Sequence, residues 1–433
     1  MGTIKPPREF QRRLIAWYAK HRREMPWRGS RDPYAIWVSE IMLQQTTTQT
    51  VRGYFDRFMG RFPTIAALAE AELDDVNRSW EGLGYYRRAA QLHRAARVIV
   101  EQYGGVFPKD YREVLALPGI GRYTAGAVLS IAYDRRLPIL EANTVRLHAR
   151  LLAYSGDPVS KEGQSILWEN AERILPDRGN IGAFNQALME LGSLVCTPRT
   201  PDCARCPVSG FCRTAEAGLQ ESIPFQKPKS PPEPRTVLAV IVRKKGGILL
   251  QQFGMGERWA GLWDFPQIDL TALGTESGFI PKPVECKSTP SARPHLRAVW
   301  LKYGATSSVA ATFNNFSQPG KSDREPHRGS DRKSDRENDR KNDLFAAMEP
   351  AVQTGVLERL SASTGRRLQL GKRLGTHRHT VTRYRILRLV HEAVDTGPAA
   401  KKATPERQGW FAPEEIAALP LNSPARRMVE KFL

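Results

Sequence analysis

Residues 117–127 read LPGIGRYTAGA, a short turn followed by the start of an apolar, helix-patterned run. The glycines of Pro118-Gly119-Ile120-Gly121 permit left-handed backbone and the close approach of a neighbouring group. A helix that begins directly after such a turn offers free N–H groups to a phosphate. The stretch therefore predicts a helix–hairpin–helix, which contacts the DNA backbone without reading base sequence. An ordinary corner between two helices is the alternative.

Helical patterning continues around this turn. Apolar residues recur every three to four positions in three long runs, REFQRRLIAWYAKHRR (8–23), TIAALAEAELDDVNRSW (64–80) and YYRRAAQLHRAARVIVEQY (85–103). That period is typical of amphipathic helices, and Gly104-Gly105 separates the last run from the turn. We therefore expect an all-helical domain over residues 8–214.

Four of the five cysteines close this domain, in the run VCTPRTPDCARCPVSGFC (195–212). Cys196, Cys203, Cys206 and Cys212 have the spacing C-x6-C-x2-C-x5-C, and their thiolates could bind a 4Fe–4S cluster or structural zinc. The spacing lacks the paired C-x2-C of zinc ribbons, so we expect a 4Fe–4S cluster in the 196–212 loop. A disulfide pair is the remaining alternative, but nothing else in the sequence is typical of a secreted protein.

The pattern changes after residue 214. Residues 215–235 include PFQKPKSPPEPR (224–235), whose prolines predict an extended linker. Beyond it, TVLAVIVRKKGGILLQQF (236–253) predicts two strands joined by a Lys-Lys-Gly-Gly hairpin. RLQLGKRLGTHRHTVTRYRILRLVHEA (367–393) predicts further strands, and PARRMVEKFL (424–433) predicts a closing helix. We expect a second, α+β domain over residues 236–433.

This second domain carries an insertion at about 317–343. Its main part, SDREPHRGSDRKSDRENDRKND (322–343), repeats Ser/Asn-Asp-Arg and has no residue that would form an apolar core. Such a segment cannot bury enough apolar surface to offset the entropy of ordering, so we expect disorder. DNA binding by this segment is the alternative, although its charges nearly cancel.

The composition indicates a polyanionic partner. Lysine and arginine total 65 against 45 acidic residues, which gives a formal net charge of +20. The arginines are scattered instead of gathered on one amphipathic helix, which favours nucleic acid over a membrane surface. The chain has no apolar run of about eighteen residues, and its N-terminus is too charged for a signal peptide. We expect no membrane partner and a cytoplasmic, nucleoid-associated protein.

Several motifs together resemble one known family. They are MPWR (25–28), DPYAIWVSEIMLQQT (32–46), WEGLGYYRRA (80–89), LPGIGRYTAGAVLSIAY (117–133), FNQALMELGSLVC (184–196) and the cysteine loop. With them the chain resembles the helix–hairpin–helix DNA glycosylases that carry a 4Fe–4S cluster, and among these the adenine DNA glycosylase (MutY) family. The resemblance implies a monomeric hydrolase of base excision repair that removes adenine mispaired with 8-oxoguanine or guanine in double-stranded DNA. It also implies that the second domain is a Nudix-like module that recognises the lesion.

The resemblance assigns Glu40 as the general acid that protonates adenine at N7. Its neighbours in the run WVSEIML are mostly apolar, which predicts partial burial and a raised carboxyl pKa. Tyr123 stands where the related endonuclease III enzymes carry a lysine nucleophile, so excision is expected to stop at an abasic site. A solvated helix glutamate and a packing tyrosine are the alternatives.

The second catalytic carboxylate departs from the family pattern. The family run Leu-Asp-Gly-Asn-Val corresponds here to LEANTV (140–145). Glu141 would stabilise the oxocarbenium sugar, and Asn143 would orient its carboxylate. The extra methylene adds about 1.5 Å of reach, and we expect helix N–H groups to favour the ionised form of Glu141. A catalytically weak lesion-binding protein is the alternative.

The resemblance also implies a set of DNA contacts. The adenine pocket would be lined by Trp27, Arg28 and Gln186, the duplex probed by Leu43, Gln45 and Tyr85, the backbone bound at Gly119 and Gly121, and the lesion contacted by Thr380. A thymine or uracil mismatch glycosylase of the same superfamily is the alternative, and it would differ in the pocket around Trp27, Arg28 and Gln186.

The second domain departs from the Nudix and family patterns at two places. Thr380 lies in His379-Thr380-Val381, where the family has Phe-Ser-His, so the hydroxyl is kept and the aromatic ring is replaced. Only Glu349 and Glu358 stand where a Nudix metal-binding helix carries its glutamates. We therefore expect no pyrophosphatase activity.

Overall fold

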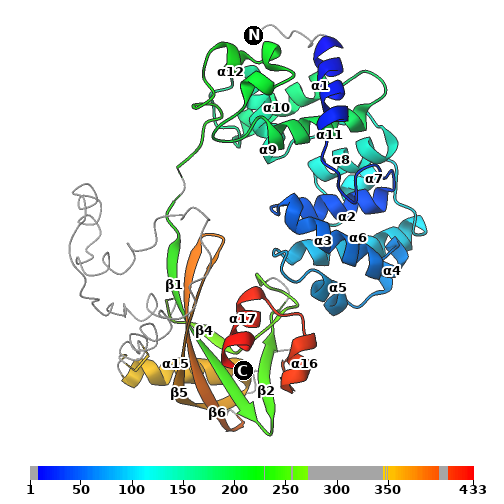
Figure 1. The fold of residues 1–433 in the computed structure, drawn as a ribbon. Coiled ribbons are helices and arrows are strands. Elements are labelled where there is room, and N and C mark those ends of the chain that lie inside the picture. Colours follow the sequence, from blue (N-terminus) through cyan, green and yellow to red (C-terminus); the bar gives the residue numbers. More distant parts are fainter. Residues whose placement is uncertain are drawn as a thin grey trace, which may run out of the picture. The chain divides into compact units, whose positions relative to one another are not determined.

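The computed structural model describes residues 8–228, 230–254, 257–271, 345–346, 348, 350–398 and 408–433. The predicted insertion at 317–343 and the fifth cysteine, Cys286, lie outside the described residues. The chain divides into two compact units, one formed by Met1–Ser230 with Met255–Leu262 and the other by Pro231–Gly254 with Trp263–Leu433. Figure 1 shows the helices of the first unit and the sheet of the second.

The first unit is helical, which confirms the predicted all-helical domain. Its helices are α1 (Arg8–His21), α2 (Pro33–Leu43), α3 (Thr48–Arg61), α4 (Ile65–Glu70), α5 (Leu73–Ser79), α6 (Arg87–Tyr103), α7 (Tyr111–Ala116), α8 (Arg122–Tyr133), α9 (Ala142–Leu152), α10 (Lys161–Ile174), α11 (Ile181–Leu194) and α12 (Arg213–Glu216). Two 3-10 helices, η1 (Cys203–Arg205) and η2 (Ser209–Phe211), lie in the cysteine loop. In the described part of the chain, no helix is long and apolar enough to cross a bilayer.

Two large apolar cores hold this unit together. The first is built mainly by α2 to α8 and surrounds the fully buried Trp37 and Trp80. The second joins α1 and α11 to the cysteine loop through Phe10, Phe184 and Cys196. Each large apolar side chain contributes roughly 1.5–3 kcal/mol when fully buried. The cysteine loop is therefore attached to the helices by packing as well as by the chain itself.

Helix α2 is buried along most of its length. Asp32 caps its N-terminus by accepting hydrogen bonds from the N–H groups of Tyr34 and Ala35, and Pro33 occupies the first turn. Every residue from Tyr34 to Met42 is buried. This helix therefore carries Glu40 into the interior.

The predicted turn between α7 and α8 is present. Gly119 has φ +76°, and a Cβ added there would lie 2.6 Å from Cβ of Gln91 on α6, so the site requires glycine. Gly121 has φ −102° and is the N-cap of α8. The prediction of left-handed backbone is therefore confirmed for Gly119 and wrong for Gly121, because the backbone of Gly121 is extended, a conformation that any residue can adopt. No described atom lies within 4 Å of a Cβ added at Gly121, so its backbone is open to a ligand.

The second unit is an α+β domain, as predicted. Its strands are β1 (Glu233–Lys244), β2 (Gly247–Gln252), β3 (Trp263–Asp264), β4 (Gln267–Asp269), β5 (Arg366–Val381), β6 (Tyr384–Pro398) and β7 (Gln408–Phe411). They form one sheet in the order β3-β2-β1-β6-β5, with β4 also paired to β1 and β7 to β2. The predicted hairpin joins β1 to β2 through Lys245 and Gly246, which both have positive φ as a two-residue hairpin turn requires.

Helices cover both faces of this sheet (Figure 1). On one face, α15 (Pro350–Thr364) contributes Val356 and Leu360 to an apolar core. On the other, α16 (Pro413–Ala418) and α17 (Ser423–Phe432) contribute Ile416 and Met428. The predicted closing helix is α17.

The domain boundaries differ from the predicted ones. Helix α12 continues to Glu216 and strand β1 begins at Glu233, so regular structure reaches into both ends of the 215–235 linker. Residues 257–262 belong to the first unit and not to the second domain. Leu262 is fully buried in the first apolar core, where Trp259 also packs. Their apolar side chains find partners far away in sequence, which a boundary drawn at the linker misses.

Candidate active site

Glu40 on α2 is buried, with 6% of its surface exposed. The phenol of Tyr123 donates a hydrogen bond of 2.5 Å to its Oε2 atom. Burial raises the pKa of Glu40 to about 7; the Tyr123 hydrogen bond opposes this rise and the nearby charge of Glu141 adds to it. The expected burial and raised pKa of Glu40 are thus present, and a proton is available at neutral pH.

Tyr123 is the second residue of α8, directly after the glycine turn. Besides Glu40, its hydroxyl lies 3.3 Å from Sδ of Met189 on α11. Burial and the charge of Glu40 raise the pKa of Tyr123 well above its ordinary value. The residue therefore stays a neutral donor aimed at Glu40, which is more specific than a packing role.

Glu141 is the N-cap of α9. Its carboxylate accepts hydrogen bonds from the N–H groups of Asn143 (2.9 Å) and Thr144 (3.0 Å), and Asn143 Nδ2 lies 3.3 Å from Oε2. The Thr144 hydroxyl closes a capping box with the Glu141 N–H. The extra methylene is accommodated because the side chain folds back onto its own helix, and Asn143 contacts the carboxylate as expected.

The pKa of Glu141 nevertheless differs in direction from the expectation. Burial raises it, and the hydrogen bonds from Asn143 and Thr144 lower it without cancelling the effect of burial. The helix N-terminus does favour the anion, as predicted, but the sequence did not show how far this carboxyl is removed from water.

Arg146 continues the contacts of Asn143 into the protein, a role that sequence reasoning missed. Its Nη2 donates to Asn143 Oδ1 (2.9 Å), and its Nε donates to the carbonyl oxygen of Cys196 (2.7 Å). An arginine about one turn after a helix N-cap is common in sequences and gives no signal of a special role. Only the tertiary contacts show that Arg146 connects Asn143, and through it Glu141, to the cysteine loop.

Arg28 belongs to a second buried polar group, centred on Glu190 of α11. Arg28 Nη2 lies 2.6 Å from Glu190 Oε2, and Arg23 Nε lies 2.8 Å from Oε1. Burial opposes ionisation of Glu190, but hydrogen bonds from Arg23 and Arg28 hold its pKa below the ordinary value. Arg28 Nη1 is buried without a hydrogen-bond partner among the described residues. Glu190 lies within the motif FNQALMELGSLVC, but a single glutamate among apolar helix residues did not indicate that it pairs with Arg23 and Arg28.

Two residues predicted to line the adenine pocket already have partners within the protein. Gln186 accepts a hydrogen bond from the Tyr18 hydroxyl (3.1 Å) and donates to the carbonyl oxygen of Gly182 (3.3 Å). Trp27 is a core residue, 7% exposed and edge-to-face with Phe55. Of the predicted pocket residues, Arg28 alone has a buried donor atom without a partner in the described structure.

The residues predicted to probe the duplex lie at the end of α2 and in two short segments of the first unit. Leu43 is the last residue of α2, and Gln45 lies two positions further on with φ +58°. Tyr85 precedes α6 with φ +49° and is 51% exposed. Thr380 is exposed on β5 of the second unit.

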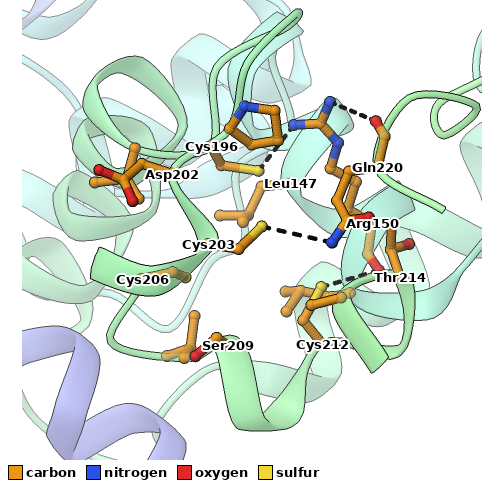
Figure 2. A pocket seen from close by; sticks show the side chains of 15 residues that line it. Leu147, Arg150, Cys196, Asp202, Cys203, Cys206, Ser209, Cys212, Thr214 and Gln220 are labelled. Carbon is orange, nitrogen blue, oxygen red and sulfur yellow. Dashed lines mark hydrogen bonds between the residues drawn. The ribbon is translucent and has the colours of Figure 1, made fainter. Parts of the chain in front are cut away.

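The four clustered cysteines surround a small cavity (Figure 2), which Leu147, Arg150 and Val208 also line. Arg150 Nη1 donates to Sγ of Cys196 at 3.3 Å. Among the described residues, no group of three or more His, Cys, Asp or Glu side chains is placed to hold a single metal ion. The four thiols line one shared cavity.

Thiol chemistry also fits a metal centre here. Burial raises the pKa of Cys206 to about 12 and raises that of Cys212. Buried thiols of this kind are poor nucleophiles when protonated, whereas a bound metal deprotonates coordinating thiols outright. Arg150 and Arg146 supply positive charge beside Cys196. The residues thus fit a cluster with anionic sulfur ligands.

Two family models match the chain. Residues 38–173 match the HhH-GPD superfamily of base excision DNA repair proteins, and residues 196–212 match the iron–sulfur binding domain of endonuclease III. The fold and these two matches place the chain in the helix–hairpin–helix class of base excision DNA repair proteins that carry a 4Fe–4S loop. The predicted cluster, and not zinc or a disulfide, is confirmed.

The adenine DNA glycosylase of Rattus norvegicus is 36% identical over 317 residues, which are 61% of each chain. That of Buchnera aphidicola subsp. Schizaphis graminum is 36% identical over 261 residues, 60% of this chain and 75% of the relative. The chain therefore spans less than two thirds of the rat protein and three quarters of the bacterial one. It belongs to the adenine DNA glycosylase family.

Solved structures give two further similarities. A thermostable thymine-DNA glycosylase is 32% identical, with a TM-score of 0.44 over 48% of this chain and 95% of its own. A MutT protein from Methanosarcina mazei is 13% identical, with a TM-score of 0.26 over 47% of this chain and 96% of its own.

Proposed function

We propose that this protein is a monofunctional DNA glycosylase that hydrolyses the N-glycosidic bond of adenine mispaired with 8-oxoguanine or guanine. Double-stranded DNA that contains these mispairs is its substrate, and it acts as a monomer in the cytoplasm, associated with the nucleoid. Family membership and the net charge of +20 support a DNA substrate. The second, Nudix-like domain is proposed to read the base opposite adenine, with Thr380 at the contact.

The proposal rests mainly on the protonation state of Glu40. Adenine leaves poorly from its sugar unless N7 is protonated, and a buried carboxyl with a pKa of about 7 can hold and donate that proton at neutral pH. The Tyr123 hydroxyl keeps the carboxyl in one orientation. A solvated surface glutamate would be ionised at neutral pH and could not serve as the acid.

The remaining steps follow from the positions of the other groups. As the C1′–N9 bond breaks, its electron pair goes to the protonated base and a positive charge develops on the sugar. The Glu141 carboxylate, held by Asn143 and the helix N–H groups, would stabilise that charge. Water then adds to C1′, and the ionised Glu40 takes the proton released. Arg28 Nη1 is the group proposed to meet the flipped adenine, since its hydrogen-bonding capacity is unused.

The 4Fe–4S cluster, held by Cys196, Cys203, Cys206 and Cys212, has no step in this sequence. When bound, it cross-links the loop that follows α11. Strand cleavage is not expected, because Tyr123 offers no amine that could form a Schiff base with the abasic sugar.

A panel of duplexes tests the proposal. The purified protein is incubated with A:8-oxoguanine, A:G, T:G and U:G duplexes, and strand breaks are scored with and without alkali. The proposal is supported if strand breaks appear in the A:8-oxoguanine and A:G duplexes, and only after alkali treatment. Excision of thymine or uracil would replace it with a mismatch glycosylase of the same superfamily, and tight binding without excision would indicate a lesion-binding protein.

The monofunctional label has its own test. Tyr123→Lys should gain some strand cleavage that borohydride traps covalently, whereas the parent protein should give no trapped product. A parent protein that traps would contain another reactive amine and would refute the label.

A further inference from the structure

Arg88, the second residue of α6, connects two separate loops of the first unit. Its Nη1 atom donates to the carbonyl oxygens of Ile41 (2.7 Å), Met42 (3.0 Å) and Gln44 (2.6 Å). These carbonyls end helix α2 and have no partner further along the helix. One guanidinium nitrogen therefore closes the end of the helix that carries Glu40.

The other terminal nitrogen of Arg88 reaches the second loop. Nη2 donates to the carbonyl oxygens of Leu83 (3.2 Å) and Gly84 (3.1 Å). The same atom lies 3.4 Å from the Thr46 hydroxyl, in the first loop. The planar, five-donor guanidinium thus joins residues 41–46 to residues 83–84.

Each joined loop contains a residue in an unusual backbone conformation. Gln45 has φ +58° and Tyr85 has φ +49°, a region that non-glycine residues rarely adopt and that persists only where surrounding contacts impose it. The Arg88 guanidinium also lies over the ring of Tyr85, at 5.7 Å from its centroid. Gln45 and Tyr85 are both exposed, so these contacts hold side chains that face solvent.

We propose that Arg88 is a positioning residue that clamps the 41–46 and 83–86 loops together, so that Gln45 and Tyr85 are presented to the duplex as one preformed wedge. This inference rests on the proposed function for the DNA contacts of Gln45 and Tyr85, whereas the clamp is a property of the free protein. A preformed wedge does not have to be ordered when DNA binds, so less binding energy is spent before the adenine is extruded.

The clamp can be tested without DNA. Arg88→Lys keeps the charge, but its single ammonium cannot span both sets of carbonyls; Arg87→Lys, at the exposed neighbouring position, is the matched control. Hydrogen–deuterium exchange should be at least about tenfold faster for the amides of both loops in Arg88→Lys than in the parent, and unchanged in Arg87→Lys. Faster exchange in one loop alone, or in neither, would overturn the clamp.

Its effect on DNA is measured with 2-aminopurine in place of the target adenine, opposite 8-oxoguanine. The Arg88→Lys protein should bind an undamaged duplex like Arg87→Lys, since the phosphate contacts of the hairpin are elsewhere. Its fluorescence rise on mispair binding should be largely lost, and excision of adenine should slow by about a hundredfold, the usual effect of misplacement by about 1 Å. Equal loss of binding to both duplexes would indicate a general folding defect and refute the positioning role.

Two safeguards separate the outcomes. If Arg88→Lys loses its cluster absorption and does not fold, Arg88→Gln, which is smaller and can reach only one loop, takes its place. If the parent protein itself neither extrudes 2-aminopurine nor excises adenine, the proposed function is at fault, and the exchange experiment still decides the clamp.

Discussion

At the scale of single residues, the proposed mechanism gives Glu40 and Glu141 opposite tasks, although burial raises the pKa of both. Glu40 must keep its proton until adenine takes it, and Glu141 must be ionised to face a cationic sugar. Their surroundings separate them, because Glu40 has one neutral hydroxyl donor whereas Glu141 has helix N–H groups and Asn143. Interacting carboxyls of this kind titrate as a pair.

We predict a bell-shaped pH dependence for single-turnover excision. The alkaline limb should fall with an apparent pKa near 7 as Glu40 loses its proton, and the acidic limb should fall as Glu141 gains one. Tyr123→Phe removes a hydrogen bond that lowers the pKa of Glu40, so it should move the alkaline limb to higher pH. A limb that stays in place would show that another group is the acid.

Glu40 should also cost stability at neutral pH. Its folded pKa of about 7 exceeds the ordinary value of 4.5, so stability present below pH 4.5 is lost as the pH rises through 7. At about 1.4 kcal/mol per pKa unit, the difference of about 2.5 between these values gives a loss of at most about 3.5 kcal/mol. Glu40→Gln should therefore abolish excision and raise Tm relative to the parent at pH 8 but hardly at pH 4. An equal Tm difference at both pH values would contradict the raised pKa.

Glu141→Asp restores the family side chain and tests the altered geometry. Aspartate is a good N-cap, so the free energy of unfolding should stay within about 0.5 kcal/mol of the parent. Because the helix start accommodates the longer acid, we expect the shorter one to withdraw from the sugar and to slow single-turnover excision by about ten- to a hundredfold. A faster aspartate variant would mean that Glu141 is misplaced in the parent, and Glu141→Gln with parental activity would remove its catalytic role.

At the scale of elements, the glycine turn before α8 positions two functions at once. Its second glycine leaves the start of α8 open to phosphate, and two residues later Tyr123 points to Glu40. Helix α9 has a similar double role, because its N-cap is Glu141 and its next turn holds Arg146 against the cysteine loop. Under the proposed function, each element thus links a DNA or cluster contact to a catalytic group.

The two glycines of this turn should respond differently to alanine. Gly119→Ala places a Cβ 2.6 Å from Gln91 at positive φ, and we expect a loss of about 1–3 kcal/mol of unfolding free energy. Gly121→Ala meets no atom and needs no unusual φ, so it should fold normally but bind an undamaged duplex more weakly. Urea unfolding measures the loss of stability, and DNA binding at two salt concentrations measures the loss of phosphate contacts. Parental affinity in Gly121→Ala would show that phosphate does not approach this backbone.

At the scale of the whole molecule, the two compact units are not two consecutive stretches of chain. Residues 257–262 lie beyond strands β1 and β2 in sequence and still complete the core of the first unit with Leu262. The stability of the first unit therefore depends on a segment that follows the linker.

Leu262→Ala should destabilise the first unit by about 2–5 kcal/mol, the usual cost of emptying a fully buried leucine site. Loss of the cluster's visible absorption on heating reports this unit. Leu270→Ala is the matched control, because Leu270 is equally apolar and buried but packs in the core of the second unit. Equal shifts of the cluster transition in both variants would contradict the assignment of Leu262.

The sequence by itself determined the features that depend on local spacing. The cysteine spacing, the glycine turn and the helical period follow from residue type and order, so the cluster loop, the hairpin and the two fold classes were predictable. The unusual residues Tyr123 and Glu141 could also be recognised from the sequence, since each is a substitution within a motif.

Tertiary structure alone decided the features that depend on which distant groups meet. Burial raises the pKa of Glu40 to about 7, and the hydrogen bond from Tyr123, which is 83 positions away, partly opposes that rise. Glu190 meets Arg23 and Arg28, and Arg88 spans two loops, through contacts that no local pattern encodes. Burial depends on packing between helices, and electrostatic effects are strong only where packing has removed water. For that reason the chemical groups could be predicted from the sequence, whereas their protonation, pairing and orientation could not.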